Sequence, residues 1–136
     1  MRKALVQAIY AWLMESDTPI HVLREAMTTF EVSADDRERG EEMFSAIIDH
    51  HESLAAYLSG ALEHWDLDRI GFVERAIIFL ALYELRHKPD VPLEVAIDEA
   101  IRLAKEFAGD DSARFVNGII DAISTQIDTP DVQDHS

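Results

Sequence analysis

One continuous stretch of the sequence, residues 73–123, constrains the fold more than any other part of the chain. Its apolar residues recur at the spacing of α-helices and are interrupted only by strong helix-boundary signals, which predicts three successive helices. The first of them, about Arg69 to Leu85, is apolar around most of its circumference. Such a helix is covered by neighbours on several sides, so it is predicted to lie at the centre of the core.

The two helices that follow are amphipathic and have clear start signals. The first of these is predicted from Pro92, in the first helical position, to about Phe107, and alanines at every fourth position let another helix approach closely. The second starts after Gly109 and continues through Ile123. Three residues are candidates for its N-cap: Asp110, Asp111 and Ser112.

The rest of the chain also predicts helices. Amphipathic spacing indicates helices over three further ranges: 2–15, 19–30 and 33–60. A proline at the start of the second range and Ser33 at the start of the third are typical of helix N-termini. A short helical turn at residues 62–65 and a capping residue, Asp68, are expected before the central helix. No segment shows the signals of a β-hairpin, so the predicted fold class is all-α.

Length and composition predict one domain. A chain of 136 residues with 48% hydrophobic residues can build a core without cross-links, and it has no cysteine for a disulfide or a thiolate metal site. We expect this domain to span residues 1–127 and the polar acidic segment 128–136 to be disordered. No apolar run reaches the ~20 residues of a membrane span, and residues 4–14 lead into acidic residues instead of a signal-peptide cleavage site. The sequence therefore predicts a soluble cytoplasmic protein.

Acidic residues dominate the charge. The chain has 12 Lys and Arg against 27 Asp and Glu, a formal net charge of −15, which disfavours broad, nonspecific binding to nucleic acid. The excess is concentrated in residues 15–68, which hold 3 basic and 14 acidic residues, whereas residues 1–14 hold Arg2 and Lys3 and no acid. Two interpretations stay open: a solvated acidic surface, or a docking face for a basic partner.

No set of residues predicts catalysis or metal binding. The run from Asp49 to Glu52 contains two histidines and two acids, but neighbouring helical residues point about 100° apart and do not converge on one ion. Adjacent acids near helix termini, as at residues 98–99 and 110–111, are typical of caps and solvent-facing charges. Because no nucleophile, base and orienting group can be proposed together, we predict neither an enzyme nor a cofactor.

Four segments of the sequence resemble a known family. They are, in order, VQAIYAW at 6–12, VERAIIFLALYEL at 73–85, DVPLEVAIDEAIRLAKEF at 90–107 and DDSARFVNGIIDAI at 110–123. Their order and spacing are similar to those of the NusB family of transcription antitermination factors. The resemblance implies an all-helical, NusB-like fold of about seven helices in two bundles. It also implies a protein that pairs with NusE, a small-subunit ribosomal protein, recognises the boxA element of nascent RNA and supports ribosomal RNA transcription.

The resemblance also implies two sets of binding residues. Bases and aromatic side chains hold a single RNA strand by phosphate contact and stacking. The positions implied on the RNA side are Arg2, Lys3, Gln7, Tyr10, Lys105, Phe107, Arg114 and Phe115. Those implied on the NusE side, where acids meet a basic protein, are Glu74, Tyr83, Glu84 and Asp111. Phe115 also lies on an apolar stripe and Asp111 is also a candidate N-cap, so structural roles stay open for both.

The amino terminus departs from the family pattern. Family members open with an arginine-rich segment before the first helix, and here only Arg2 and Lys3 are present. Fewer phosphate contacts lower the affinity for RNA, so we expect weak RNA binding by the chain alone. The leading hypothesis is an adaptor that binds a NusE-type partner and contributes to RNA recognition within that complex. The alternative is a diverged paralogue that acts as a protein-interaction module without RNA binding. The apolar helix faces suit both a monomer and a dimer.

Overall fold

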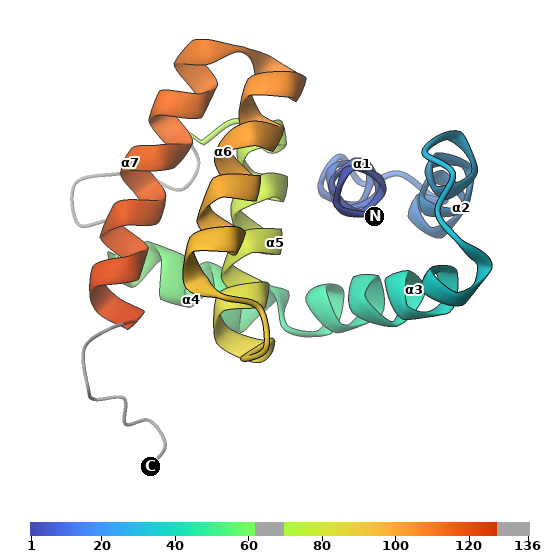
Figure 1. Ribbon diagram of the computed structural model, residues 1–136, viewed down its shortest axis with the longest axis horizontal. Coiled ribbons are helices and arrows are strands. Elements are labelled where there is room, and N and C mark those ends of the chain that lie inside the picture. Colours follow the sequence, from blue (N-terminus) through green and yellow to red (C-terminus); the bar gives the residue numbers. More distant parts are fainter. Residues whose placement is uncertain (62–69, 128–136) are drawn as a thin grey trace.

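The computed structural model describes residues 1–61 and 70–127, and within these ranges it contains seven α-helices and no β-strand. The helices are α1 (Arg2–Leu13), α2 (Pro19–Thr29), α3 (Ala34–Asp49), α4 (His51–Ala61), α5 (Phe72–His87), α6 (Leu93–Ala108) and α7 (Asp110–Ile127). In Figure 1, α1, α2 and α3 form one group and α4, α5, α6 and α7 form a second, which confirms the predicted all-α fold in two bundles. None of the described helices is long and apolar enough to cross a membrane.

Helix α5 is the centre of the core, as its apolar sequence predicts. Each residue from Ala76 to Glu84 is buried, and the helix contacts α1, α3, α4, α6 and α7. It begins at Phe72, three residues after the predicted start, with the extended residue Gly71 as its N-cap. The predicted turn at residues 62–65, the predicted cap Asp68 and the predicted disordered segment 128–136 lie outside the described residues.

Helix α1 connects the two bundles. It packs against α2 and α3 on one side and against α5 on the other, and Figure 1 shows it end-on between α2 and α5. Leu5 and Ile9 of its apolar side are buried. The helix ends at Leu13, two residues before the predicted end, because Glu15 adopts a left-handed backbone conformation with φ 62°. The start of α1 is therefore held against both bundles.

The range 33–60 forms two helices instead of the single amphipathic helix that its apolar spacing predicts. Helix α3 ends at Asp49, and its C-cap His50 (φ −97°, ψ 7°) leaves the helical conformation. The Nδ1 atoms of His50 and His51 each donate to a carbonyl oxygen of α3, at 2.8 and 2.7 Å. These bonds satisfy carbonyls at the end of the helix and stabilise the break. The buried residues keep helical spacing across the break and therefore do not reveal it.

The start of α3 agrees with the sequence. The Oγ atom of Ser33 accepts a hydrogen bond from the backbone N–H of Asp36 at 3.2 Å, which confirms Ser33 as the N-cap. Helix α2 likewise begins at Pro19, directly after its N-cap Thr18. In this bundle, the sequence therefore predicts helix starts best where a capping side chain or a proline marks them.

Helices α6 and α7 pack against each other and are joined by a single glycine. Gly109 has φ 98° and ψ −179°, a conformation nearly confined to glycine, and α7 begins immediately after it. The three predicted N-cap candidates, residues 110–112, therefore lie within the first turn of α7 instead of before it. Pro92 is the N-cap of α6 and not its first helical residue, because its ψ of 146° is extended.

Candidate functional site

Basic residues from three helices lie around α6, which an ion pair joins to the start of α1 and which α7 follows after a single glycine. Nζ of Lys3 lies 3.0 Å from Oε1 of Glu106, and Nη1 of Arg102 lies 3.2 Å from Oε2 of the same carboxylate. Glu106 therefore joins the first turn of α1 to α6. We call this surface the basic corner and define it by five residues: Arg2, Lys3, Arg102, Lys105 and Arg114.

Lys105 and Arg114 extend the basic corner to the turn between α6 and α7. Nζ of Lys105 lies 3.8 Å from Oδ1 of Asp110, and the guanidinium of Arg114 donates to the carboxylate of Asp111. All four of these side chains are exposed. Ion pairs therefore join α1 to α6 through Glu106 and α6 to the first residue of α7 through Asp110, and Arg114 lies in the next turn of α7.

Arg2 is the least accessible base of the basic corner. Its Nε lies 3.1 Å from Oε2 of Glu84 on α5, and the side chain of Glu84 is only 6% exposed. Burial raises the pKa of Glu84 above its ordinary value, and the nearby charge of Arg2 partly opposes this shift. One predicted RNA-binding residue and one predicted partner-binding residue thus contact each other inside the fold, where the pair connects α1 to α5.

The remaining predicted RNA-binding residues differ in accessibility. Gln7 and Tyr10 follow Lys3 at helical spacing along one side of α1, and Tyr10 is 38% exposed. Phe107 on α6 and Phe115 on α7 are half-buried and pack against the core. Tyr10 is therefore the most accessible aromatic ring of this set, and Phe115 has the structural role that its apolar stripe indicates.

The predicted partner-binding residues lie on different sides of α5. Glu74 accepts a hydrogen bond from Oγ of Ser112 at 2.7 Å, which places it near Asp111 at the start of α7. Tyr83 is nine positions further along α5, about 180° around the helix, and its side chain is buried. Glu84 is buried as well. The fold thus brings Glu74 to the residue that follows Asp111, whereas Tyr83 and Glu84 lie further along α5 and are buried.

The two histidines of the run 49–52 have different neighbours. The ring of His50 lies 4.7 Å from that of His87, and the ring of His51 lies 4.8 Å from that of Trp12, measured between centroids. Within residues 1–61 and 70–127, no group of three or more His, Cys, Asp or Glu side chains is arranged to hold a metal ion. The rings therefore serve packing between α1, the α3–α4 junction and α5.

Helix α3 carries a second charged surface on its exposed side. We call it the acidic stripe and define it by Glu38, Glu42 and Asp49, which are exposed and recur at helical spacing. Together with Glu41 and Ser45 they line a groove along the helix. Glu41 is paired with an arginine of α2, but no ion pair joins the stripe residues to any other described residue. The acidic segment of the sequence thus contains carboxylates that are accessible to a cationic partner.

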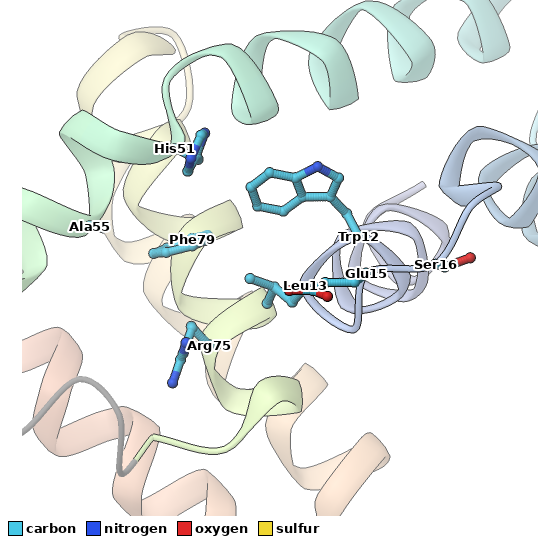
Figure 2. A pocket seen from close by; sticks show the side chains of 8 residues that line it. All are labelled: Trp12, Leu13, Glu15, Ser16, His51, Ala55, Arg75 and Phe79. Carbon is cyan, nitrogen blue, oxygen red and sulfur yellow. The ribbon is translucent and has the colours of Figure 1, made fainter.

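An aromatic hollow lies between the end of α1, the start of α4 and α5 (Figure 2). It has a volume of about 430 Å³ and is lined by Trp12, Leu13, Glu15, Ser16, His51, Ala55, Arg75 and Phe79. Figure 2 shows the Trp12 indole facing His51 and Phe79 across this space. Trp12 is half-buried and packs against the core, and the walls of the hollow are mainly apolar, in contrast to the basic corner.

Comparison with known proteins identifies the family. Residues 1–125 match the model of the NusB family. The chain belongs to the NusB family. Transcription antitermination protein NusB of Edwardsiella ictaluri (strain 93-146) is 36% identical over 126 residues, which are 93% of this chain and 90% of that protein. The NusB protein of Shewanella sp. (strain W3-18-1) is 38% identical over 122 residues, which are 90% of each chain. The family resemblance of the four sequence segments is therefore confirmed.

Solved NusB structures share the fold. The chain of T. maritima NusB is 31% identical, has a TM-score of 0.80 and aligns over 92% of this chain and 88% of that chain. A crystal structure of antitermination factors NusB and NusE in complex with dsRNA contains a chain with a TM-score of 0.79 and 22% identity, aligned over 92% of this chain and 93% of that one. The second likeness, at its lower identity, shows the shared helical fold.

The sequence did not assign a role to Arg102 or Glu106. Their spacing in α6, which is the third of the four NusB-like segments, together with Glu99 one turn earlier, is typical of ion pairs within a helix, and these pairs form. Spacing alone does not show that Lys3 reaches the same carboxylate of Glu106. That contact depends on how α1 packs against the rest of the NusB fold, so only the structure reveals it.

Proposed function

We propose that this NusB-family protein is a transcription antitermination factor that pairs with a NusE-type ribosomal protein, recognises boxA RNA and supports ribosomal RNA transcription. The observation that carries the proposal is the basic corner, where bases of α1, α6 and α7 lie together on a NusB fold. Relatives named as transcription antitermination proteins, and a fold neighbour in complex with NusE and RNA, support it. The proposal is of a cytoplasmic protein that acts by binding and not by catalysis.

The RNA strand is proposed to lie along the basic corner. Lys3, Lys105 and Arg114 offer charged groups to phosphates, and Tyr10 offers an accessible ring for stacking. The other proposed contacts are Arg2, Gln7, Phe107 and Phe115. Each of the three bases already has a carboxylate partner, and the whole chain carries a net charge of −15, so the attraction to RNA is small. A basic partner that neutralises part of this charge strengthens RNA binding, which is why recognition is proposed for the complex.

The partner surface is proposed to centre on Glu74, which accepts a hydrogen bond from Ser112, and on Asp111, the residue next to that serine at the start of α7. A cationic ribosomal protein gains complementary charge contacts there. Tyr83 and Glu84 stay predicted contacts, and because both are buried, neighbouring side chains have to move before a partner reaches them. The acidic stripe adds a long-range attraction for the same cationic partner.

RNA binding with and without the NusE-type partner tests the proposal. We expect boxA RNA to bind weakly to the chain alone and more tightly, with a preference over a scrambled RNA, when the partner is present. Fluorescence anisotropy with both RNAs measures this. If boxA has no advantage in either condition, the alternative of a protein-interaction module without RNA binding replaces the proposal.

Arg114→Glu tests the RNA side. This reversal is expected to weaken RNA binding by roughly tenfold, because it removes a phosphate contact and places a carboxylate beside the strand. Arg39→Glu is the matched control, since Arg39 is exposed and pairs with an acid three positions earlier, Asp36, just as Arg114 pairs with Asp111. Equal losses in the two variants would reject the assignment of RNA to the basic corner.

Asp111→Ala tests the partner side. We expect weaker association with the NusE-type protein in isothermal titration calorimetry, and little change in the control Glu94→Ala, whose exposed side chain lies near the other end of α6. RNA affinity is measured for the same variants, because the substitution also releases Arg114 from its ion pair. An unchanged dissociation constant for the partner would reject the role of Asp111.

A further inference from the structure

A hollow at the start of α1 is not explained by the proposed RNA contacts alone. It has a volume of about 420 Å³, and its lining includes Arg2, Lys3, Phe30, Glu99 and Arg102. Three of these residues are cations, contributed by α1 and α6. We call this space the amino-terminal hollow. It has the size of a small-ligand site and combines several positive groups with one aromatic wall.

Glu106 holds the two most accessible of these cations. Its Oε1 lies 3.0 Å from Nζ of Lys3 and its Oε2 lies 3.2 Å from Nη1 of Arg102, so each carboxylate oxygen contacts one cation. A phosphate group also presents two or more acceptor oxygens and binds lysine and arginine through charge-assisted hydrogen bonds. The carboxylate of Glu106 therefore makes the contacts that a phosphate in the same place would make.

The ion pairs of Glu106 with Lys3 and Arg102 can be replaced by contacts of the same cations with another anion. The side chains of Lys3, Glu106 and Arg102 are 40%, 41% and 52% exposed, and ion pairs at such exposure contribute little to stability. The cations keep their positions for other reasons. Lys3 lies over the ring of Phe30, 5.6 Å from its centroid, and Arg102 has a second acidic partner in Glu99. Loss of Glu106 thus leaves both cations in place and accessible.

We propose that the amino-terminal hollow receives a backbone phosphate of the RNA, with Arg102 as a third cation beside Arg2 and Lys3, and that Glu106 competes with this phosphate. The inference rests on the proposed RNA binding and adds to it one binding residue and one opposing charge. The ligand is the sugar–phosphate backbone, so the contact is independent of base sequence. Competition by Glu106 is one cause of the weak RNA binding expected of the chain alone.

Glu106→Gln tests the competition. The substitution keeps the size of the side chain and removes its charge, so we expect roughly threefold tighter binding of a short single-stranded boxA RNA and of a scrambled RNA of equal length. Glu94→Gln is the matched control, because it removes the same charge from an exposed position of α6 about 18 Å away along the helix axis. Equal effects of the two variants on RNA affinity, measured by fluorescence anisotropy, would overturn the role of Glu106.

Arg102→Gln tests the phosphate contact. We expect weaker binding of both RNAs and a plot of log affinity against log salt concentration that is less steep by about 0.7, the value for one phosphate contact in a single strand. Circular dichroism confirms that the variant is folded. An unchanged affinity and slope, while Arg114→Glu in the same series does lose RNA binding, would overturn this inference and leave the proposed function standing. Failure of the unmodified chain to bind RNA with or without the partner would overturn both.

Discussion

The basic corner and the acidic stripe carry charge in opposite ways. In the basic corner each cation lies within ion-pair distance of a carboxylate, as Lys3 does with Glu106. In the acidic stripe on α3, the carboxylates have no ion-pair partner among residues 1–61 and 70–127. One surface is therefore close to neutral although it is rich in bases, and the other carries an uncompensated negative charge.

This difference separates two kinds of recognition. On a balanced surface, a phosphate has to replace a carboxylate as the partner of each cation, and the displaced carboxylate stays nearby and opposes binding. An unbalanced acidic surface repels RNA and attracts a cationic protein over about a Debye length, roughly 8–10 Å at physiological salt. For the proposed RNA binding, the position of the counter-charges is therefore expected to affect affinity more than the number of bases does.

The largest effect is expected from a change that moves the basic corner itself. Gly109 joins α6 to α7 with φ 98° and ψ −179°, where a side chain strains the backbone. We expect Gly109→Ala to lower the free energy of unfolding by about 1–3 kcal/mol and to weaken RNA binding, because Lys105 and Asp110 flank this turn. Urea unfolding and anisotropy measure the two effects.

Gly118→Ala is the control for this change. A Cβ atom added at Gly118 or at Gly109 meets no atom within 4 Å, so the two substitutions differ in backbone conformation and not in available space. Gly118 lies inside α7, where alanine is expected to raise stability by about 0.5–1 kcal/mol. If both variants gain stability, the turn does not depend on the conformation of Gly109.

A smaller effect is expected from reversing the acidic stripe. The triple variant Glu38→Lys, Glu42→Lys and Asp49→Lys replaces an uncompensated negative surface with a positive one. We expect the chain alone to bind boxA and scrambled RNA about equally and roughly tenfold more tightly at low salt, and the cationic partner to associate more slowly. Anisotropy at several salt concentrations and stopped-flow association test this. Unchanged RNA affinity would mean that the stripe has no influence on the basic corner.

The smallest effect concerns the buried end of the basic corner. Burial raises the folded-state pKa of Glu84 above its ordinary value of 4.5, so the folded protein binds this proton more tightly than the unfolded chain does. Its contribution to stability is therefore greatest at low pH and falls as the pH rises from 4.5 through the raised pKa. We expect the stability of the unmodified protein, relative to Glu84→Gln, to fall over this interval in urea unfolding.

Glu41 is expected to change the pH dependence of stability in the opposite direction, in the same urea unfolding experiment. A hydrogen bond from Arg24 lowers the pKa of the Glu41 carboxyl below its ordinary value. Its contribution to stability is present above pH 4.5 and is lost as the pH falls through the lowered pKa. Glu41→Gln should therefore change the pH dependence in the direction opposite to Glu84→Gln, and the same direction for both would contradict the role of burial at Glu84.

Most of the fold follows from the sequence. Apolar spacing predicts the central α5, the amphipathic α6 and α7 and the start of α2, because these features depend on local pattern and on residues such as Pro19. The break at His50 could not be predicted, because apolar spacing continues across it while two imidazoles satisfy the carbonyls. The local sequence pattern shows only how the apolar residues are spaced. A tight break between two helices that keeps this spacing therefore cannot be recognised from the sequence.

The candidate site follows from the sequence only in part. The family resemblance identifies Lys3, Lys105 and Arg114, and the structure places Lys3 and Lys105 at the end of α6 and Arg114 near the start of the adjoining α7. It does not identify the bridge through Glu106, because a contact between α1 and α6 depends on packing between helices that lie far apart in the sequence. For the same reason, the resemblance places Arg2 and Glu84 in separate functional sets although they contact each other.

The contact between Arg2 and Glu84 joins residues that are 82 positions apart. A ribosome adds roughly 5–20 residues per second, so α1 emerges several seconds before the helix that completes its binding site has been synthesised. During that time the first helix has no α5 to pack against, and the cationic surface does not exist. Under the proposed function, a nascent chain that ends before α6 lacks Lys105 and Arg114 of the basic corner, so RNA binding is expected only after translation has proceeded into α7.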